Sequence, residues 1–185
     1  MKRWSVIWML VALVAAGSAS ASTFLAMSQA ELVQASETVV KGRVLEIRSS
    51  WDAAGRVIFT DAVVEVEEAL MGRPEALVTV RTFGGTVDGY TVEAHGFPKF
   101  SVSDRVLLFL EPMNNGTAKV AGYQQGHYRV VVDRSGVELA VPTVDEGAHL
   151  LRPDGRPVVP AKTVPFHTLK DSILEEAGRA GRLEH

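Results

Sequence analysis

The strongest constraint on the fold is the alternation of apolar and polar residues over residues 58–67. One face of this segment carries Ile58, Thr60, Ala62, Val64 and Val66, and the other carries Phe59, Asp61, Glu65 and Glu67. Successive side chains of a β-strand point to opposite faces, so the pattern predicts a strand with a buried apolar face and a solvated acidic face. Half-buried strands of this kind are typical of antiparallel sheets.

A second segment, residues 39–47, changes the phase of its apolar residues beside a glycine. Val40 and Val44 share one face with Gly42, and the next apolar residues, Leu45 and Ile47, follow in the opposite phase. A β-bulge, which places one extra residue in a strand, produces such a change and bends the strand. Bent strands allow a small sheet to close into a barrel.

Further strands are expected at residues 77–83, 105–111, 118–123, 128–133 and 136–140. The run Val106–Leu110 is continuously apolar, which predicts that both faces of its strand are covered. Asn114-Asn115-Gly116 predicts the hairpin turn that joins this strand to the next.

The C-terminal part has a different composition. Residues 141–165 are rich in Pro and Gly without periodicity, which predicts a loop or an extended arm. Thr168 is expected to cap a last helix, in which apolar residues recur at helical spacing at Leu169, Ile173 and Leu174.

Together these segments predict a mainly β chain that forms a small antiparallel OB-like barrel with a short N-terminal helix and a C-terminal helix. A β-sandwich is the alternative. The N-terminal helix spans residues 28–36 and begins with a capping box formed by Ser28 and Glu31. The barrel domain is expected over residues 22–140, and the arm with the C-terminal helix over residues 141–185.

The N-terminus has the pattern of a secretory signal peptide. Lys2 and Arg3 precede the apolar run Trp4–Ala16, and Ala19-Ser20-Ala21 is a signal-peptidase site. Cleavage would make Ser22 the mature N-terminus and deliver the protein to a periplasm or the extracellular space. An uncleaved membrane anchor is disfavoured, because the run is shorter than the roughly 20 residues that span a bilayer. No membrane span is therefore expected after cleavage.

Composition excludes several function classes. The chain has no Cys, so disulfides, thiol nucleophiles and zinc–thiolate sites are ruled out. Its formal charge is −3, and removal of Lys2 and Arg3 with the leader leaves −5. A mildly acidic domain without a basic groove is a poor nucleic-acid binder, so no nucleic-acid partner is expected. Leu183-Glu184-His185 is either native or the remnant of a purification tag.

Several short motifs occur in an order that resembles a family of small secreted bacterial proteins of unknown function. They cover about residues 28–133 and comprise Glu31-Leu32-Val33, Thr38–Val44, Val64-Glu65-Val66, Leu70-Met71-Gly72, Phe97-Pro98, Phe100, Asp104–Leu110, Gly122 and Gly126-His127-Tyr128. The order of elements is also similar to netrin-like modules and tissue inhibitors of metalloproteinases, which implies an OB-type barrel. In those inhibitors the mature N-terminal Cys chelates the zinc of the target through its amine and carbonyl. In this chain Ser22, followed by Thr23, stands at that position.

The aromatic residues near turns and loops are the best candidates for a binding surface, because such residues often recognise proteins and carbohydrates. The alternative is that they belong to the core of a small barrel. The candidate binding residues are Trp51, Phe59, His95, Phe97, Tyr123 and His127. Phe83, Tyr90 and Phe100 also flank the glycine-rich middle, and Tyr128 lies with Tyr123 on either side of Gln124-Gln125-Gly126-His127.

No motif for catalysis, a metal or a cofactor is recognised. The histidines lack the spacing of paired metal ligands on a helix, so no cofactor or metal is expected. The favoured function is an exported, non-catalytic binding module for a protein or cell-envelope partner, of which a protease inhibitor and an accessory protein are specific forms. The alternative is a hydrolase whose site is assembled in space from Asp61, Glu65, His95 and His127. The sequence indicates neither the identity of the partner nor the oligomeric state.

Overall fold

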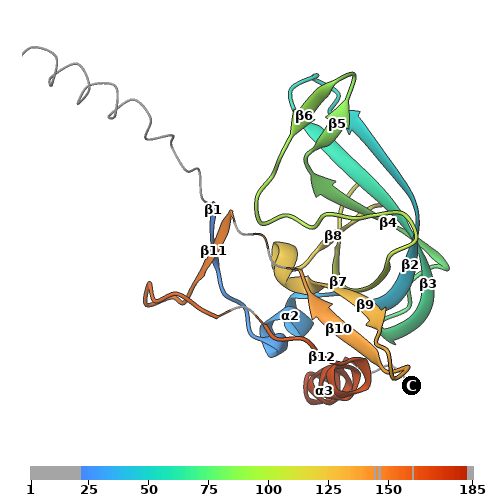
Figure 1. The fold of residues 1–185 in the computed structure, drawn as a ribbon, viewed down its shortest axis with the longest axis vertical. Helices are drawn as coiled ribbons and strands as arrows, with labels where there is room; N and C mark the ends of the chain where they lie inside the picture. Colours follow the sequence, from blue (N-terminus) through green and yellow to red (C-terminus); the bar gives the residue numbers. More distant parts are fainter. Residues whose placement is uncertain (1–21, 144, 146, 160, 183–185) are drawn as a thin grey trace, which may run out of the picture.

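The computed structural model describes residues 22–143, 145, 147–159 and 161–182, so the predicted leader at residues 1–21 and the C-terminal tripeptide lie outside the described residues. Within this part of the chain, five strands close a barrel (Figure 1). They are β2 (Thr38–Trp51), β3 (Ile58–Met71), β4 (Leu77–Phe83), β7 (Arg105–Pro112) and β8 (Ala118–Val120).

The strands of the barrel follow the order β2-β3-β4-β8-β7, and β7 pairs again with β2. Neighbours are antiparallel except β4 and β8, which run parallel. The closed barrel confirms the predicted mainly β, OB-like fold over the β-sandwich.

The predicted bend of the first barrel strand is present. The register of β2 against β3 shifts at three places, and one shift skips Leu45, between Val44 and Glu46. Gly42 lies at another shift, where the backbone of β3 comes very close. A Cβ atom on Gly42 would lie 2.3 Å from the carbonyl oxygen of Glu65. Glycine is therefore required here for close approach of the two strands.

Strand β7 is buried on both faces, as the apolar run predicted. Its residues Val106, Leu108 and Leu110 point into the barrel, where they pack with Val40, Val44, Ala62, Val64, Val80 and Val120. Leu107 and Phe109 point outward into a second core, which contains Leu32, Val33, Val39, Leu70, Met71, Tyr128, Val130, Phe166, Leu169 and Ile173. One strand thus separates the two hydrophobic cores of the molecule.

The second core is covered by helices α2 (Gln29–Ala35) and α3 (Phe166–Arg179), which pack on each other below the barrel in Figure 1. The capping box of Ser28 and Glu31 is confirmed. The predicted N-cap of the last helix is wrong, because α3 begins at Phe166 and Thr168 lies inside its first turn. Pro165 occupies the N-cap position with a φ of −56°, so the chain turns into the helix directly after a strand.

The sheet continues beyond the barrel. The 3-10 turn η1 (Tyr123–Gly126) leads to β9 (His127–Val132), which pairs with β7, and β10 (Glu138–Pro142) and β12 (Val164–Pro165) follow as further neighbours. A short hairpin of β5 (Gly85–Val87) and β6 (Tyr90–Val92) forms the tip at the top of Figure 1.

The arm predicted as loop contains the strand β11 (Ala148–Leu151). It pairs in parallel with β1 (Ser22–Leu25), on the left of the barrel in Figure 1. The first described strand therefore associates with the arm rather than with the barrel strands, across the boundary predicted at residue 140.

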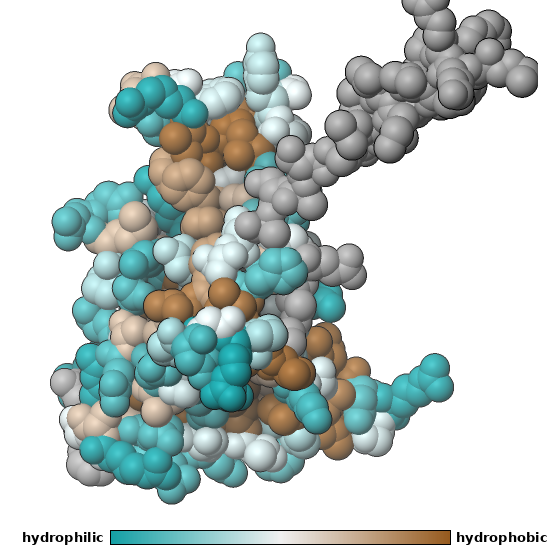
Figure 2. Space-filling view, turned by 90° about the vertical axis from the view of Figure 1, so that its left-hand side faces the viewer, coloured by the Kyte–Doolittle hydropathy of each residue, from teal (hydrophilic) through white to brown (hydrophobic). Residues whose placement is uncertain are grey.

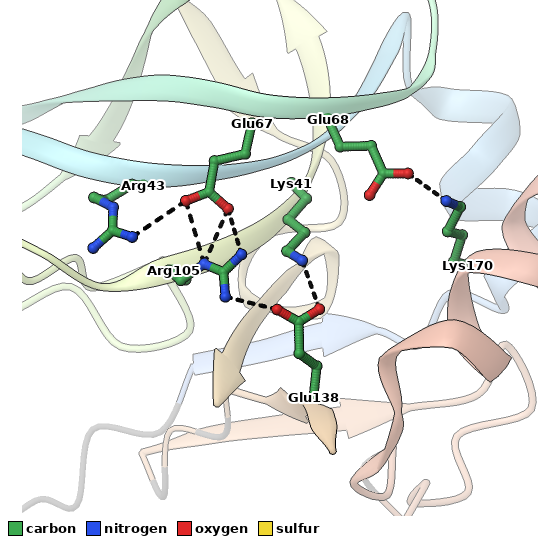
Figure 3. A network of polar contacts seen from close by, with 7 residues as sticks. All are labelled: Lys41, Arg43, Glu67, Glu68, Arg105, Glu138 and Lys170. Atoms are coloured by element: carbon green, nitrogen blue, oxygen red, sulfur yellow. Dashed lines mark hydrogen bonds and ion pairs between the residues drawn. The ribbon is translucent and has the colours of Figure 1, made fainter. Parts of the chain in front are cut away.

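Ion pairs on the outer face of the sheet join β10 and α3 to the barrel (Figure 3). Lys41, whose residue is 7% exposed, places Nζ 2.6 Å from Glu138 Oε2 and 4.5 Å from the ring centroid of Phe166. Arg105 links Glu138 to Glu67 through contacts of 2.6 and 2.7 Å. The hydrogen bond from Lys41, together with Arg105, holds the pKa of Glu138 below its usual value.

The packing at Gly42 predicts a large effect of one methyl group. Gly42→Ala should lower the free energy of unfolding by about 3 kcal/mol, since the backbone of β3 would have to move. Gly55→Ala is the control, because nothing lies within 4 Å of its Cβ position and only its positive φ of 66° costs energy, about 1 kcal/mol. Urea unfolding measures both, and equal losses would contradict the close approach.

The buried ammonium of Lys41 predicts a second effect on stability. Glu138→Gln should cost about 2 kcal/mol, because the nearly buried amino group of Lys41 would lose its carboxylate partner. Adding Lys41→Met in the same chain should recover much of this loss. Glu175→Gln, which removes an exposed partner of Arg179 on α3, is the matched control and should leave thermal unfolding unchanged. Additive effects of Glu138→Gln and Lys41→Met would contradict this coupling.

Candidate binding site

Among the described residues, five aromatic rings form a continuous row outside the barrel. The ring centroids of Phe59 and Phe83 are 4.7 Å apart, and those of Phe83 and Phe97 are 5.4 Å apart. Tyr123 follows at 5.0 Å from Phe97, and Phe24 at 4.7 Å from Tyr123. Ring pairs at these distances attract each other, so the row is a preorganised surface.

The first two rings of the row come from neighbouring strands. Phe59 on β3 and Phe83 on β4 are direct register partners, on the face turned away from the barrel interior. Arg81 lies over the ring of Phe59, at 5.4 Å from the centroid, and its guanidinium also binds both carboxylate oxygens of Asp61. The acidic face of the predicted strand therefore carries an aromatic residue flanked by an ion pair.

The other three rings depend on special backbone positions. Phe97 follows Gly96, whose φ is +82°, and a Cβ on Gly96 would lie 2.1 Å from the ring of Phe24. Tyr123 has a positive φ of 60° at the start of η1. Phe24 is brought in by β1, which is held in place by its pairing with β11.

A groove of about 460 Å³ opens beside four of these rings. It lies where β4 and β8 separate, since their pairing in the described chain is limited to Val80 opposite Ala118. The groove is lined by Phe59, Phe83, Phe97 and Tyr123, by the apolar residues Met27, Met113 and Val120, and by the charged residues Arg81, Glu111 and Lys119.

The groove combines an accessible aromatic floor with a charged rim. Phe83 is 42% exposed and Tyr123 is 46% exposed. Lys119 and Glu111 form an ion pair of 2.9 Å on one side, and Arg81 with Asp61 forms another on the opposite strands. From the side on which β1 and β11 lie, Figure 2 shows a band of hydrophobic residues below the tip. This arrangement suits binding to a partner whose surface has an apolar centre with polar groups around it.

The structure separates the other predicted binding residues from the groove. Trp51 lies at the tip, where its ring centroid is 6.0 Å from that of Tyr90. His95 Nδ1 lies 3.1 Å from Asp145 Oδ1, and the same carboxylate accepts hydrogen bonds from the backbone of Gly96 and Gly147. His95 therefore takes part in a contact that attaches the arm to the loop before Phe97.

The predicted mature N-terminus is held by the arm. Ser22 N donates a hydrogen bond of 3.0 Å to the carbonyl oxygen of Gly147, and Thr23 continues the strand opposite His149. The backbone nitrogen that would chelate a metal in an inhibitor is thus already engaged.

The residues of the hydrolase hypothesis have separate environments. Asp61 binds Arg81, Glu65 lies exposed on β3, His95 binds Asp145, and His127 is buried in the protein. In the described ranges no group of three or more His, Asp or Glu side chains is arranged to hold a metal ion. No catalytic arrangement of these four residues follows from the geometry.

His127 does not lie on the surface, although it was among the candidate binding residues. It is 1% exposed, its ring centroid is 4.9 Å from that of Phe100, and both ring nitrogens lack a partner among the described residues. Burial, together with Arg129, lowers the pKa of His127 to about 4. The imidazole is therefore neutral in the folded protein at neutral pH.

No protein-family model matches this chain, and no curated protein matches it either. In the part of the chain that the structure describes, no helix has the length and apolar character needed to cross a bilayer.

The sequence did not indicate Phe24 or Arg81 as site residues, and it did not predict that the rings of Phe59 and Phe83 contact each other. The register pairing of the two phenylalanines could have been found by aligning the outward faces of the strands at 58–67 and 77–83 across their turn. Phe24 carried no local signal, because its position depends on a strand pairing with residues 148–151.

The buried His127 predicts an acid-sensitive fold. An unfolded chain binds this proton near pH 6.5, and the folded chain binds it only near pH 4, so the unfolded state holds more protons between these values. The free energy of unfolding should therefore fall as the pH is lowered from 6.5 to 4, by up to about 3 kcal/mol from this residue.

Urea unfolding of the wild type and of His127→Leu over this pH range provides the measurement. The stability difference between the two proteins should shift in favour of the variant on acidification. His149→Gln, at an exposed histidine of β11, should follow the wild-type curve. Parallel curves for wild type and His127→Leu would show that His127 is not responsible.

Proposed function

We propose that this chain is an exported, non-catalytic binding module that contacts a protein or cell-envelope partner through the aromatic groove. The observation that carries the proposal is the row of rings from Phe59 to Phe24, with Phe83 and Tyr123 more than 40% exposed. Aromatic side chains offer large contact areas at a low cost in conformational entropy, and they dominate binding energy at interfaces.

Export is supported by the signal-peptide pattern of residues 1–21. Without cysteines, an exported domain has no disulfides to stabilise it, and the two hydrophobic cores on either side of β7 supply apolar burial instead.

A protease inhibitor or an accessory protein is the specific form of this module that the resemblance favours. Because Phe24 ends the aromatic row, a partner in the groove would also approach β1 and the N-terminus at Ser22. Inhibition by amine chelation would require Ser22 N to leave the carbonyl of Gly147. A form that begins at Ser22 and a form with one extra residue should then differ in inhibition of a zinc protease, and equal inhibition would rule out this route.

The groove itself is tested by site-specific crosslinking. A photoreactive phenylalanine analogue at Phe83 should crosslink to the partner in the producing cells, whereas the same analogue at Tyr90, on the tip, should not. The affinity of the captured partner should fall about tenfold or more with Phe83→Ala or Tyr123→Ala, since exposed aromatic anchors carry such energies. Trp51→Ala compares the tip with the groove. Loss of affinity with Trp51→Ala alone would contradict binding through the groove.

A further inference from the structure

A second cavity, of about 440 Å³, lies between the arm and the barrel and is separate from the aromatic groove in most of its lining. Its roof is the ribbon in which β1, β11 and the backbone near Val158 pair side by side, with Val158 N donating to Leu150 O. Its floor is formed by η1, the start of β9 and the end of β10. The volume lies in the range of pockets for small molecules, about 300–1,000 Å³.

The walls of this cavity are mainly aliphatic. They include Ala26, Met27, Pro142, Ala148, Leu150, Leu151, Pro157, Val158, Val159 and Ala161. Among the described lining residues, the aromatic side chains are the phenol of Tyr128 and the imidazole of His149. These mainly aliphatic walls suit an aliphatic chain better than a planar ligand, because they offer little surface for stacking.

Polar groups with unused hydrogen-bonding capacity line the floor. Tyr128 is 8% exposed and Gln124 is 5% exposed. Gln124 Oε1 accepts a hydrogen bond of 2.9 Å from Asp145 N, but no partner among the described residues binds Gln124 Nε2 or the hydroxyl of Tyr128. Both atoms keep some accessible surface, since neither is among the closed-off side-chain atoms without a partner in the described chain, and a ligand placed in the cavity can therefore bind them.

The chemistry of these two groups restricts the ligand. The amide nitrogen of Gln124 can only donate hydrogen bonds, and the hydroxyl of Tyr128 can donate one. Both are satisfied by a ligand group that accepts hydrogen bonds, such as a carboxylate. An amine head group would leave Gln124 Nε2 without an acceptor.

We propose that this cavity binds an aliphatic carboxylic acid, with its hydrocarbon chain under the β1–β11 ribbon and its carboxylate at Tyr128 and Gln124. Burial of each methylene contributes about 0.8 kcal/mol at most, so the aliphatic walls supply the affinity and the two donors fix the orientation. Binding at this site does not require a partner in the aromatic groove, although Met27 lines both.

Isothermal titration of the purified protein with laurate tests the proposal. The wild type should bind one laurate per chain in a saturable manner. Val158→Trp should abolish binding by filling the cavity, whereas Val132→Trp, at an exposed position of β9 outside the cavity, should bind as the wild type does. Tyr128→Phe keeps the ring and removes the hydroxyl, and it should weaken binding about tenfold. Absence of saturable binding, or unchanged binding by Val158→Trp, would overturn the proposal.

A spin-labelled fatty acid locates the ligand in the wild type and does not depend on the folding of any variant. It should broaden the NMR signals of Leu150, Val158 and Tyr128 and leave those of Phe59 and Phe83 unaffected. Broadening confined to Phe59 and Phe83 would place the ligand in the aromatic groove and overturn the assignment. Titration with a lysophospholipid of the same acyl-chain length distinguishes a free fatty acid from a membrane lipid as the ligand. Binding of laurate alone supports a free acid, and binding of the lysophospholipid alone would overturn it.

Discussion

The structure depends on one strand whose two faces are both buried. In β7, Leu108 belongs to the barrel interior, and its neighbours Leu107 and Phe109 belong to the core under the helices. Strand β7 therefore contributes to two cores. One is the interior of the barrel, and the other is covered by β9, β10 and the two helices. A small cysteine-free protein gains enough apolar burial for stability in this way, because the same strand is used by both cores.

Much of the fold could be predicted from the sequence, because its signals are local. The alternation over β3, the bulge near Gly42 and the capping box of α2 each reflect neighbouring residues, and the structure confirms them. The start of α3 was misplaced, since Pro165 allowed the helix to begin directly after a strand. The strand β11 was missed, because it has no pattern of its own and pairs with a segment more than 120 positions earlier in the chain.

The candidate sites were less predictable than the fold. Tyr123 and Tyr128 are close in the sequence and both are aromatic residues near a loop, but the structure places Tyr123 in the aromatic groove and Tyr128 in the aliphatic cavity. The η1 turn between them directs the two rings to different sides, and its backbone has a positive φ at Tyr123. Residue periodicity does not predict such a turn. The two tyrosines, which the sequence suggested for one binding surface, therefore belong to two separate sites.

The parallel pairing of β1 with β11 has a consequence for the order of folding. A chain is synthesised from its N-terminus, so Phe24 emerges long before residues 148–151. The pairings that close the barrel span shorter stretches of the chain and can form first, whereas closing the larger loop between β1 and β11 is slower. The N-terminal strand is therefore among the last elements to fold. In a chain truncated before the arm, β1 would have no partner strand and would expose the apolar ring of Phe24.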